Sequence, residues 1–74
     1  MLAQATERVP LSDGFRWRFA PSTKVLMAAV KTIDAERQCC RFLKFVLTTE
    51  PDGRDMWLEV TGPEGTREFL SNLL

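Results

Sequence analysis

The fold is decided by residues 23–49, TKVLMAAVKTIDAERQCCRFLKFVLTT, where one periodicity replaces another. From Thr23 to about Cys39, apolar residues recur every three or four positions, which is the spacing of an amphipathic helix. From Phe42 to Thr49 the chain is rich in aromatic and β-branched residues that alternate between two faces, which is typical of a strand. The stretch therefore predicts a long helix followed directly by a strand.

Alternation also predicts two strands before the helix. Residues 15–19, FRWRF, alternate strictly, so the three aromatic side chains are expected to face the core and the arginines to face out. The run Ser12-Asp13-Gly14 just before them is a turn signal. Residues 8–11 are then expected to form a short preceding strand, and Pro10 confines it to the edge of the sheet because proline cannot donate to a strand ladder.

The last third of the chain predicts a hairpin and a second helix. Residues 56–61 alternate like a strand, and the turn signal PDG at residues 51–53 separates them from the strand before. These two strands are expected to pair as an antiparallel hairpin. Residues 68–74 then predict a short helix whose apolar side is formed by Phe69, Leu70, Leu73 and Leu74.

Together these elements predict one α+β domain over residues 1–74. Their order is (strand)–strand–helix–strand–strand–helix. We expect a two-layer sandwich in which two helices cover one face of a mainly antiparallel sheet of three or four strands. If the strands on either side of the long helix share that sheet, their crossover is right-handed, and the remaining hairpin strand can lie between them.

Composition narrows the classes of function. Ten basic and ten acidic residues give no net charge, which argues against nucleic acid as a partner. No apolar run is long enough to cross a bilayer, and the first residues lack the pattern of a signal peptide. We therefore expect no membrane partner and a cytoplasmic location. A domain of 74 residues buries little apolar surface, so a homodimer is a possible assembly.

The two cysteines of the chain, Cys39 and Cys40, are adjacent, and the sequence has no histidine. Neighbours on a regular helix point about 100 degrees apart, but a junction between helix and strand can bring both thiols to one point. There they could share a soft ion such as trivalent arsenic, mercury, monovalent copper or zinc. Glu36 lies one helical turn earlier and is expected to supply a third ligand or to orient the pair.

The same residues argue against an enzyme. A cysteine hydrolase needs a basic partner, and histidine is absent. The negative end of the helix and Glu36 disfavour a thiolate, whereas Arg37 and Arg41 favour one, so strong activation is not expected. The redox spacing Cys-x-x-Cys is missing, and a disulfide between neighbours would be strained. We therefore expect a non-catalytic domain that binds or senses a soft metal or metalloid.

A second interpretation, from a different class, stays open. Trp57 alternates away from the apolar side of its strand, and with Phe42 and Val46 it could form an apolar patch on the open face of the sheet. Such a patch would serve an interaction or dimerisation module with a protein partner. The cysteines would then be small core residues, since free cysteine is often buried.

Two runs of the sequence, ERQCCRFLKFVL (residues 36–47) and MWLEVTGPEGTREFL (residues 56–70), resemble a group of small bacterial proteins of uncharacterised function. Those proteins carry a Glu-x-x-Cys-Cys-Pro-Phe-like stretch, then a hairpin ending in a Trp-Leu-Glu-Val-like strand and a short helix. The resemblance covers residues 14–74, and Arg41 stands where the group usually has proline. It implies a shared fold and no known activity, with a shared thiol site at Glu36, Cys39, Cys40, Phe42 and Phe45.

Overall fold

A computed structural model describes residues 4–73, and the side chains of residues 4–72. The predicted apolar contributions of Leu73 and Leu74 lie outside the described side chains. Neither helix within these residues has the length and apolar composition needed to span a membrane. The elements follow one another as β1 (Glu7–Leu11), β2 (Gly14–Phe19), α1 (Thr23–Cys39), β3 (Lys44–Thr49), β4 (Met56–Thr61) and α2 (Thr66–Leu73).

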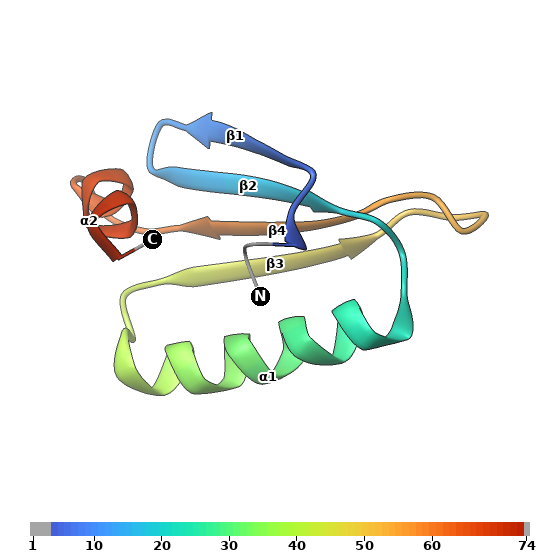
Figure 1. The fold of residues 1–74 in the computed structure, drawn as a ribbon. Helices are drawn as coiled ribbons and strands as arrows, with labels where there is room; N and C mark the ends of the chain where they lie inside the picture. The colour runs from blue at the N-terminus through green and yellow to red at the C-terminus, as the bar shows by residue number, and fades with distance from the viewer. Residues whose placement is uncertain (1–3, 74) are drawn as a thin grey trace.

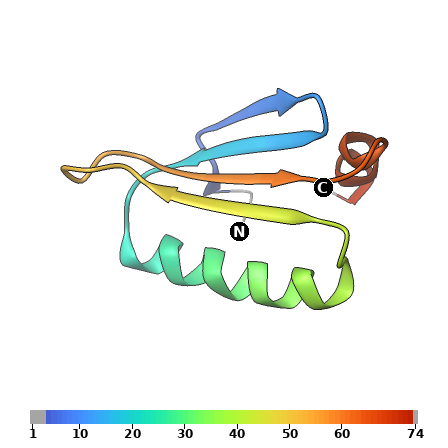
Figure 2. The same ribbon diagram turned by 180° about the vertical axis from the view of Figure 1, so that it is seen from behind.

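The four strands form one open antiparallel sheet in the order β1-β2-β4-β3 (Figure 1). This confirms the predicted α+β class and the predicted hairpin of β3 and β4. The strands flanking α1, β2 and β3, belong to this sheet, and β4 lies between them. The strand containing Pro10, β1, lies at the edge as predicted, where its missing donor costs no ladder bond. Seen from behind, α1 runs along the β3 side of the sheet (Figure 2).

The core forms on one face of the sheet because the register pairs apolar residues of neighbouring strands with one another. Trp17 of β2 pairs with Leu58 of β4, and Leu58 pairs in turn with Leu47 of β3. Buried residues of both central strands and of α2 form the core cluster, namely Phe15, Trp17, Phe19, Met56, Leu58, Val60 and Leu70. The predicted inward position of Phe15, Trp17 and Phe19 is therefore confirmed.

The long helix begins and ends at specific capping contacts. The Ser22 hydroxyl oxygen accepts a hydrogen bond from the Val25 amide at 3.0 Å, so Ser22 is the N-cap of α1. At the other end the Cys40 amide donates to the Glu36 carbonyl at 2.7 Å, but the backbone of Cys40 has left the helical region. The chain then turns, so the helix stops without a proline at Arg41.

The inner face of α1 packs incompletely on the sheet. Of the 17 residues of α1, all of them described, Ala29 is the only buried one. Leu26 and Ile33 are half-buried against the core, and Val30 is 46% exposed although its spacing predicts an inward position. Because Thr32 and Glu36 follow Ala29 on the inner side, the apolar contact weakens toward the C-terminal end of the helix.

The strand after the helix starts two residues later than predicted, at Lys44 instead of Phe42. The Leu43 amide donates to the Cys40 carbonyl at 3.1 Å, and this turn removes Phe42 from the strand. The Phe42 ring instead meets the Phe69 ring of α2 edge-on, with centroids 5.2 Å apart. The prediction that Phe42 lies on the open sheet face with Trp57 is therefore wrong.

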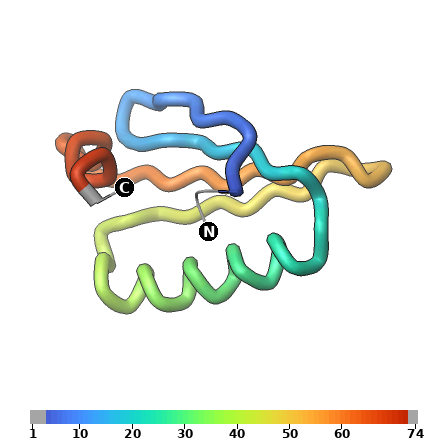
Figure 3. The backbone as a smooth tube through the Cα atoms, in the orientation of Figure 1, coloured from blue at the N-terminus to red at the C-terminus, as the bar shows by residue number. Residues whose placement is uncertain are grey.

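The second helix starts at Thr66, two residues earlier than predicted. Both the amide and the hydroxyl of Thr66 donate to the Pro63 carbonyl, at 3.1 and 2.6 Å. Thr66 is fully buried, so these two bonds satisfy its polar groups where water cannot. They fix α2 across the end of the sheet, at the same end of the molecule as the last turn of α1 (Figure 3).

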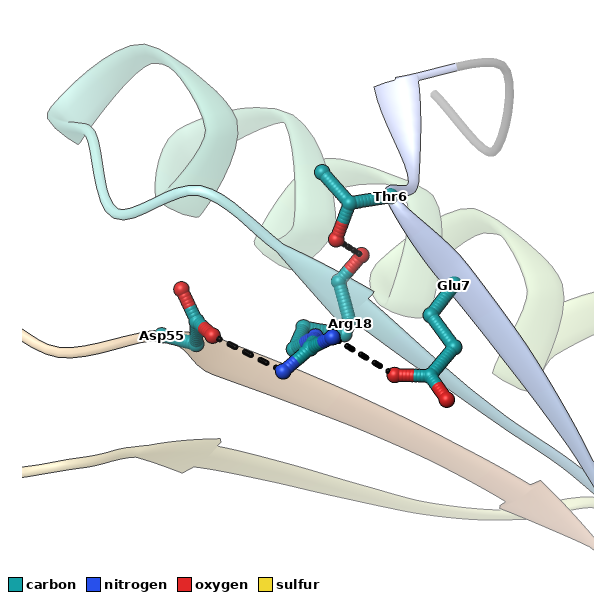
Figure 4. A network of polar contacts seen from close by, with 4 residues as sticks. All are labelled: Thr6, Glu7, Arg18 and Asp55. Atoms are coloured by element: carbon teal, nitrogen blue, oxygen red, sulfur yellow. Dashed lines mark hydrogen bonds and ion pairs between the residues drawn. The ribbon is translucent and has the colours of Figure 1, made fainter.

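The open face carries an ionic network that joins three strands (Figure 4). The Arg18 guanidinium lies 2.8 Å from the Glu7 carboxylate of β1 and 3.4 Å from that of Asp55, just before β4. The Thr6 amide and hydroxyl both donate to the Arg18 carbonyl, at 2.8 and 3.3 Å. Partly exposed ion pairs add little stability, so the register of β1 depends mainly on its backbone pairing with β2.

Candidate functional site

An apolar cavity lies where the last half of α1 and α2 meet the sheet. Its volume is about 460 Å³, within the range of small-molecule sites. The cavity is partly open to solvent, so a small ligand can enter it from the surface. The sheet, α2, α1 and the turn after α1 all contribute to its wall, which is formed by Trp17, Thr32, Glu36, Cys39, Cys40, Leu43, Leu58, Val60, Phe69 and Leu70.

All three residues predicted as soft-metal ligands, Glu36, Cys39 and Cys40, line this cavity. Cys39 is the last residue of α1 and is exposed, whereas Cys40 caps the helix and is only 8% exposed. Cys40 has φ −120° and ψ 76°, so the angle between neighbours on a regular helix does not apply to it. The helix end thereby presents one accessible and one sheltered thiol to the same space.

The nearest charge to the sheltered thiol is a carboxylate. The Cys40 Sγ lies 4.0 Å from the Glu36 Oε2, and the geometry is that of a weak S–H donation to the carboxylate. Arg37, predicted to favour a thiolate, instead donates two hydrogen bonds to the Asp34 carboxylate, at 2.7 and 3.1 Å. Its charge is therefore directed away from the thiols.

The protonation of Cys40 follows from this environment. Burial raises the pKa of the Cys40 thiol above the ordinary value for cysteine, and the neighbouring Cys39 and the Glu36 charge raise it further. Cys40 is thus a neutral thiol at neutral pH. An uncharged thiol is a poor nucleophile, which agrees with the expectation that this cysteine is not strongly activated.

Alkylation of Cys40 is expected to require alkaline pH. In a Cys39→Ser protein, where Cys40 is the only thiol, the rate of reaction with iodoacetamide should rise with pH through a midpoint higher than that of the same protein unfolded in urea. The thiolate is the reacting form, and burial remains the main cause of the raised pKa. Rates measured by mass spectrometry between pH 7 and pH 11 give the midpoint. A midpoint equal to or below that of the unfolded protein would contradict the sheltered position of this thiol.

The donor set limits which metals the cavity suits. Within residues 4–73, no group of three or more histidine, cysteine, aspartate or glutamate side chains is arranged to hold a metal ion. The cavity offers two sulfurs, with one carboxylate 4.0 Å from the second of them. A structural zinc site needs four ligands, so the part of the chain that is described holds no closed zinc site.

The open face of the sheet holds two of the three residues of the second prediction. Trp57 of β4 pairs with Thr48 of β3, and Val46 lies two positions away on the same face. The guanidinium carbons of Arg16 and Arg18 lie 4.2 and 5.5 Å from the centre of the Trp57 indole ring. The face around Trp57 therefore carries charged side chains of both signs beside the indole, since Arg18 also pairs with Glu7 and Asp55.

The apolar wall of the cavity is the part of the site that sequence reasoning missed. Trp17 was predicted as a core residue, and Leu58 and Val60 lie on the apolar side of their strand. The alternation of these strands carries no sign that the three side chains also line a cavity. The sequence of the helix contains one indication of the cavity: the inner side of the helix changes from apolar Ala29 to polar Thr32 and Glu36.

No protein-family model, curated protein or solved structure matches this chain.

Proposed function

We propose that this domain binds a soft metal or metalloid through Cys39 and Cys40, with Glu36 as an accessory ligand or orienting group. One observation carries the proposal: both thiols and the carboxylate line the same cavity of about 460 Å³. Thiolates are the ligands that soft ions prefer, and two adjacent thiols can hold one ion as a chelate. The domain then serves binding, sensing or transfer of the ion, with no chemical turnover.

The unequal exposure of the two thiols supports this use. An arriving ion meets Cys39 first, because Cys39 is exposed and Cys40 is buried. Transfer to a shared position with Cys40 then places the ion against the apolar wall formed by α2 and the sheet. Removal of water from that position strengthens the electrostatic part of a metal–thiolate bond.

Three finer points belong to the same proposal. The two-layer arrangement expected from the sequence would enclose the cavity, since both helices place side chains against the same face of the sheet. A cytoplasmic location would keep Cys39 and Cys40 reduced, as free thiols. A shared thiol site with the small bacterial proteins that the sequence resembles stays a prediction.

A second candidate function is an interaction or dimerisation module that uses the open face around Trp57 and Val46. The observation that favours it is the stacking of Arg16 and Arg18 on Trp57, on the face opposite the core. Aromatic and arginine side chains are enriched in protein interfaces. We place it second because the two guanidiniums already cover part of the indole, whereas the thiol cavity has no such covering group among its wall residues.

Titration of the reduced, metal-free protein tests the first candidate. Arsenite, mercuric ion, zinc and monovalent copper would each be added, and native mass spectrometry would record stoichiometry and oligomeric state together. We expect one ion per chain for at least one of them, and no uptake by the protein with both Cys39→Ser and Cys40→Ser. The chain is expected to stay folded in that variant by circular dichroism.

A short peptide, ERQCCR (residues 36–41), is the matched control because it carries the same three ligands without the cavity. Uptake by the protein that is no tighter than uptake by this peptide would overturn the proposal. A dimer that persists in the double serine variant and is lost in a Trp57→Ala variant would instead support the interaction module.

A further inference from the structure

The cavity has more space than a single ion bound to the two thiols would fill. The cavity of about 460 Å³ is walled mainly by aromatic and aliphatic side chains of the sheet and α2, and both thiols belong to its wall. An ion held between Cys39 and Cys40 would leave most of this apolar space without contacts. A ligand that joins a thiophilic atom to an apolar group would fill both parts.

The number of thiols limits how many bonds the protein can make to a thiophilic atom. Trivalent arsenic forms three bonds, so an inorganic arsenic centre that is fully bound to protein needs three sulfurs. The chain contains two cysteines, and residues 4–73 include no group of three metal-binding side chains. An arsenic atom that already carries one carbon substituent needs only two more ligands, and Cys39 and Cys40 supply them.

We infer that the preferred ligand of this cavity is a trivalent arsenic compound with one apolar organic substituent, bonded through arsenic to Cys39 and Cys40. This inference rests on the proposed function and names its ligand class. The organic group lies in the apolar part of the cavity, against Trp17, Leu58 and Leu70.

The binding step balances without any other reactant. In water the compound exists as a dihydroxide, R–As(OH)₂. Two As–O bonds break and two As–S bonds form, and the two hydroxyl groups leave as water with the two thiol protons. Arsenic stays trivalent and nothing is oxidised or reduced. The ring that forms contains one more atom than a disulfide between the same neighbours, which relieves the strain of that disulfide.

Phenylarsine oxide and inorganic arsenite are the probes that test the inference. For phenylarsine oxide we expect a one-to-one adduct whose mass shows that both hydroxyl groups are lost. Its affinity for the protein should exceed its affinity for the ERQCCR peptide by about 100-fold, since the phenyl ring leaves water only in the protein. For arsenite, the affinity for the protein should exceed the affinity for the peptide by much less, because arsenite has no apolar group to bury.

A variant that fills the cavity separates the role of the thiols from that of the apolar wall. Thr32 lines the cavity and is half-buried, so Thr32→Phe should remove the preference for phenylarsine oxide and leave arsenite uptake unchanged. The matched control is Lys31→Phe, which places the same side chain at an exposed position of α1. Leu43→Trp, in the turn after α1, is a second filling variant should Thr32→Phe fail to fold.

Fluorescence of Trp17 gives an independent signal. Trp17 lines the cavity, whereas Trp57 lies on the other face of the sheet, so a Trp57→Phe protein reports the cavity alone. We expect phenylarsine oxide to quench this fluorescence with a one-to-one end point.

The outcomes distinguish the two proposals. Thiol-dependent uptake of arsenite or mercury with no preference for the phenyl compound would overturn this inference and leave the proposed function standing. A preference that survives both filling variants would also overturn it, because the organic group would lie elsewhere. Absence of any thiol-dependent uptake would overturn both proposals.

Discussion

Replacing Cys39 with serine is expected to weaken the uptake of a two-thiol ligand by about 1000-fold, since the second bond of a chelate forms at high effective concentration. The free energy of unfolding should change by less than about 0.5 kcal/mol, because the Cys39 side chain is exposed and packs in no core cluster. Isothermal titration calorimetry and urea unfolding measure the two quantities on the same protein samples.

The Cys40→Ser protein is the matched comparison. It should lose uptake to the same extent, but it should also lose stability, since Cys40 is 8% exposed and serine would place a hydroxyl in its sheltered position. A Cys39→Ser protein that takes up ligand as well as the parent would show that the pair does not act as a chelate. The cysteines would then be structural, and the open sheet face would become the leading candidate.

The faces of the strands were predictable because alternation in a strand has a fixed period. Once Phe15, Trp17 and Phe19 are placed on one face of β2, the register puts Leu58 and Val60 on the same face of β4. The position of β4 between β2 and β3 is one that the connection rules for strands joined by a helix allow but do not require.

The path of the chain between α1 and β3 was not predictable from periodicity. A single backbone bond, from the Leu43 amide to the Cys40 carbonyl, decides that Phe42 belongs to a turn. The sequence around Phe42 is equally compatible with a turn and with the start of the strand, because an aromatic residue can occupy either position. Its contact with Phe69 depends on where α2 lies, which is a tertiary property.

The site shows the same division between local and tertiary information. The grouping of Glu36 with Cys39 and Cys40 follows from helical spacing, which the sequence contains. The burial of Cys40 and the exposure of Cys39 depend on the cap conformation at Cys40. The cavity itself arises from the distance between α1 and the sheet, and no single segment of sequence encodes that distance.

Replacing Phe19 with alanine is expected to bring the domain close to unfolding. Phe19 is 1% exposed in the core cluster, at the end of β2 just before α1, and removal of a buried phenyl group costs about 3–5 kcal/mol. A domain of 74 residues has a free energy of unfolding of about 4–11 kcal/mol in total. The melting temperature should therefore fall by about 20 °C, as measured by circular dichroism.

Phe42→Ala is the matched control, since it removes the same ring from a residue that is 47% exposed. Its main loss is the edge-on contact with Phe69, so the expected cost is about 1 kcal/mol. If Phe42→Ala instead destabilised the domain as much as Phe19→Ala, the contact between the turn and α2 would hold the fold together. The wall of the cavity would then be the structural centre of the domain, and a ligand that entered there would have to displace core packing.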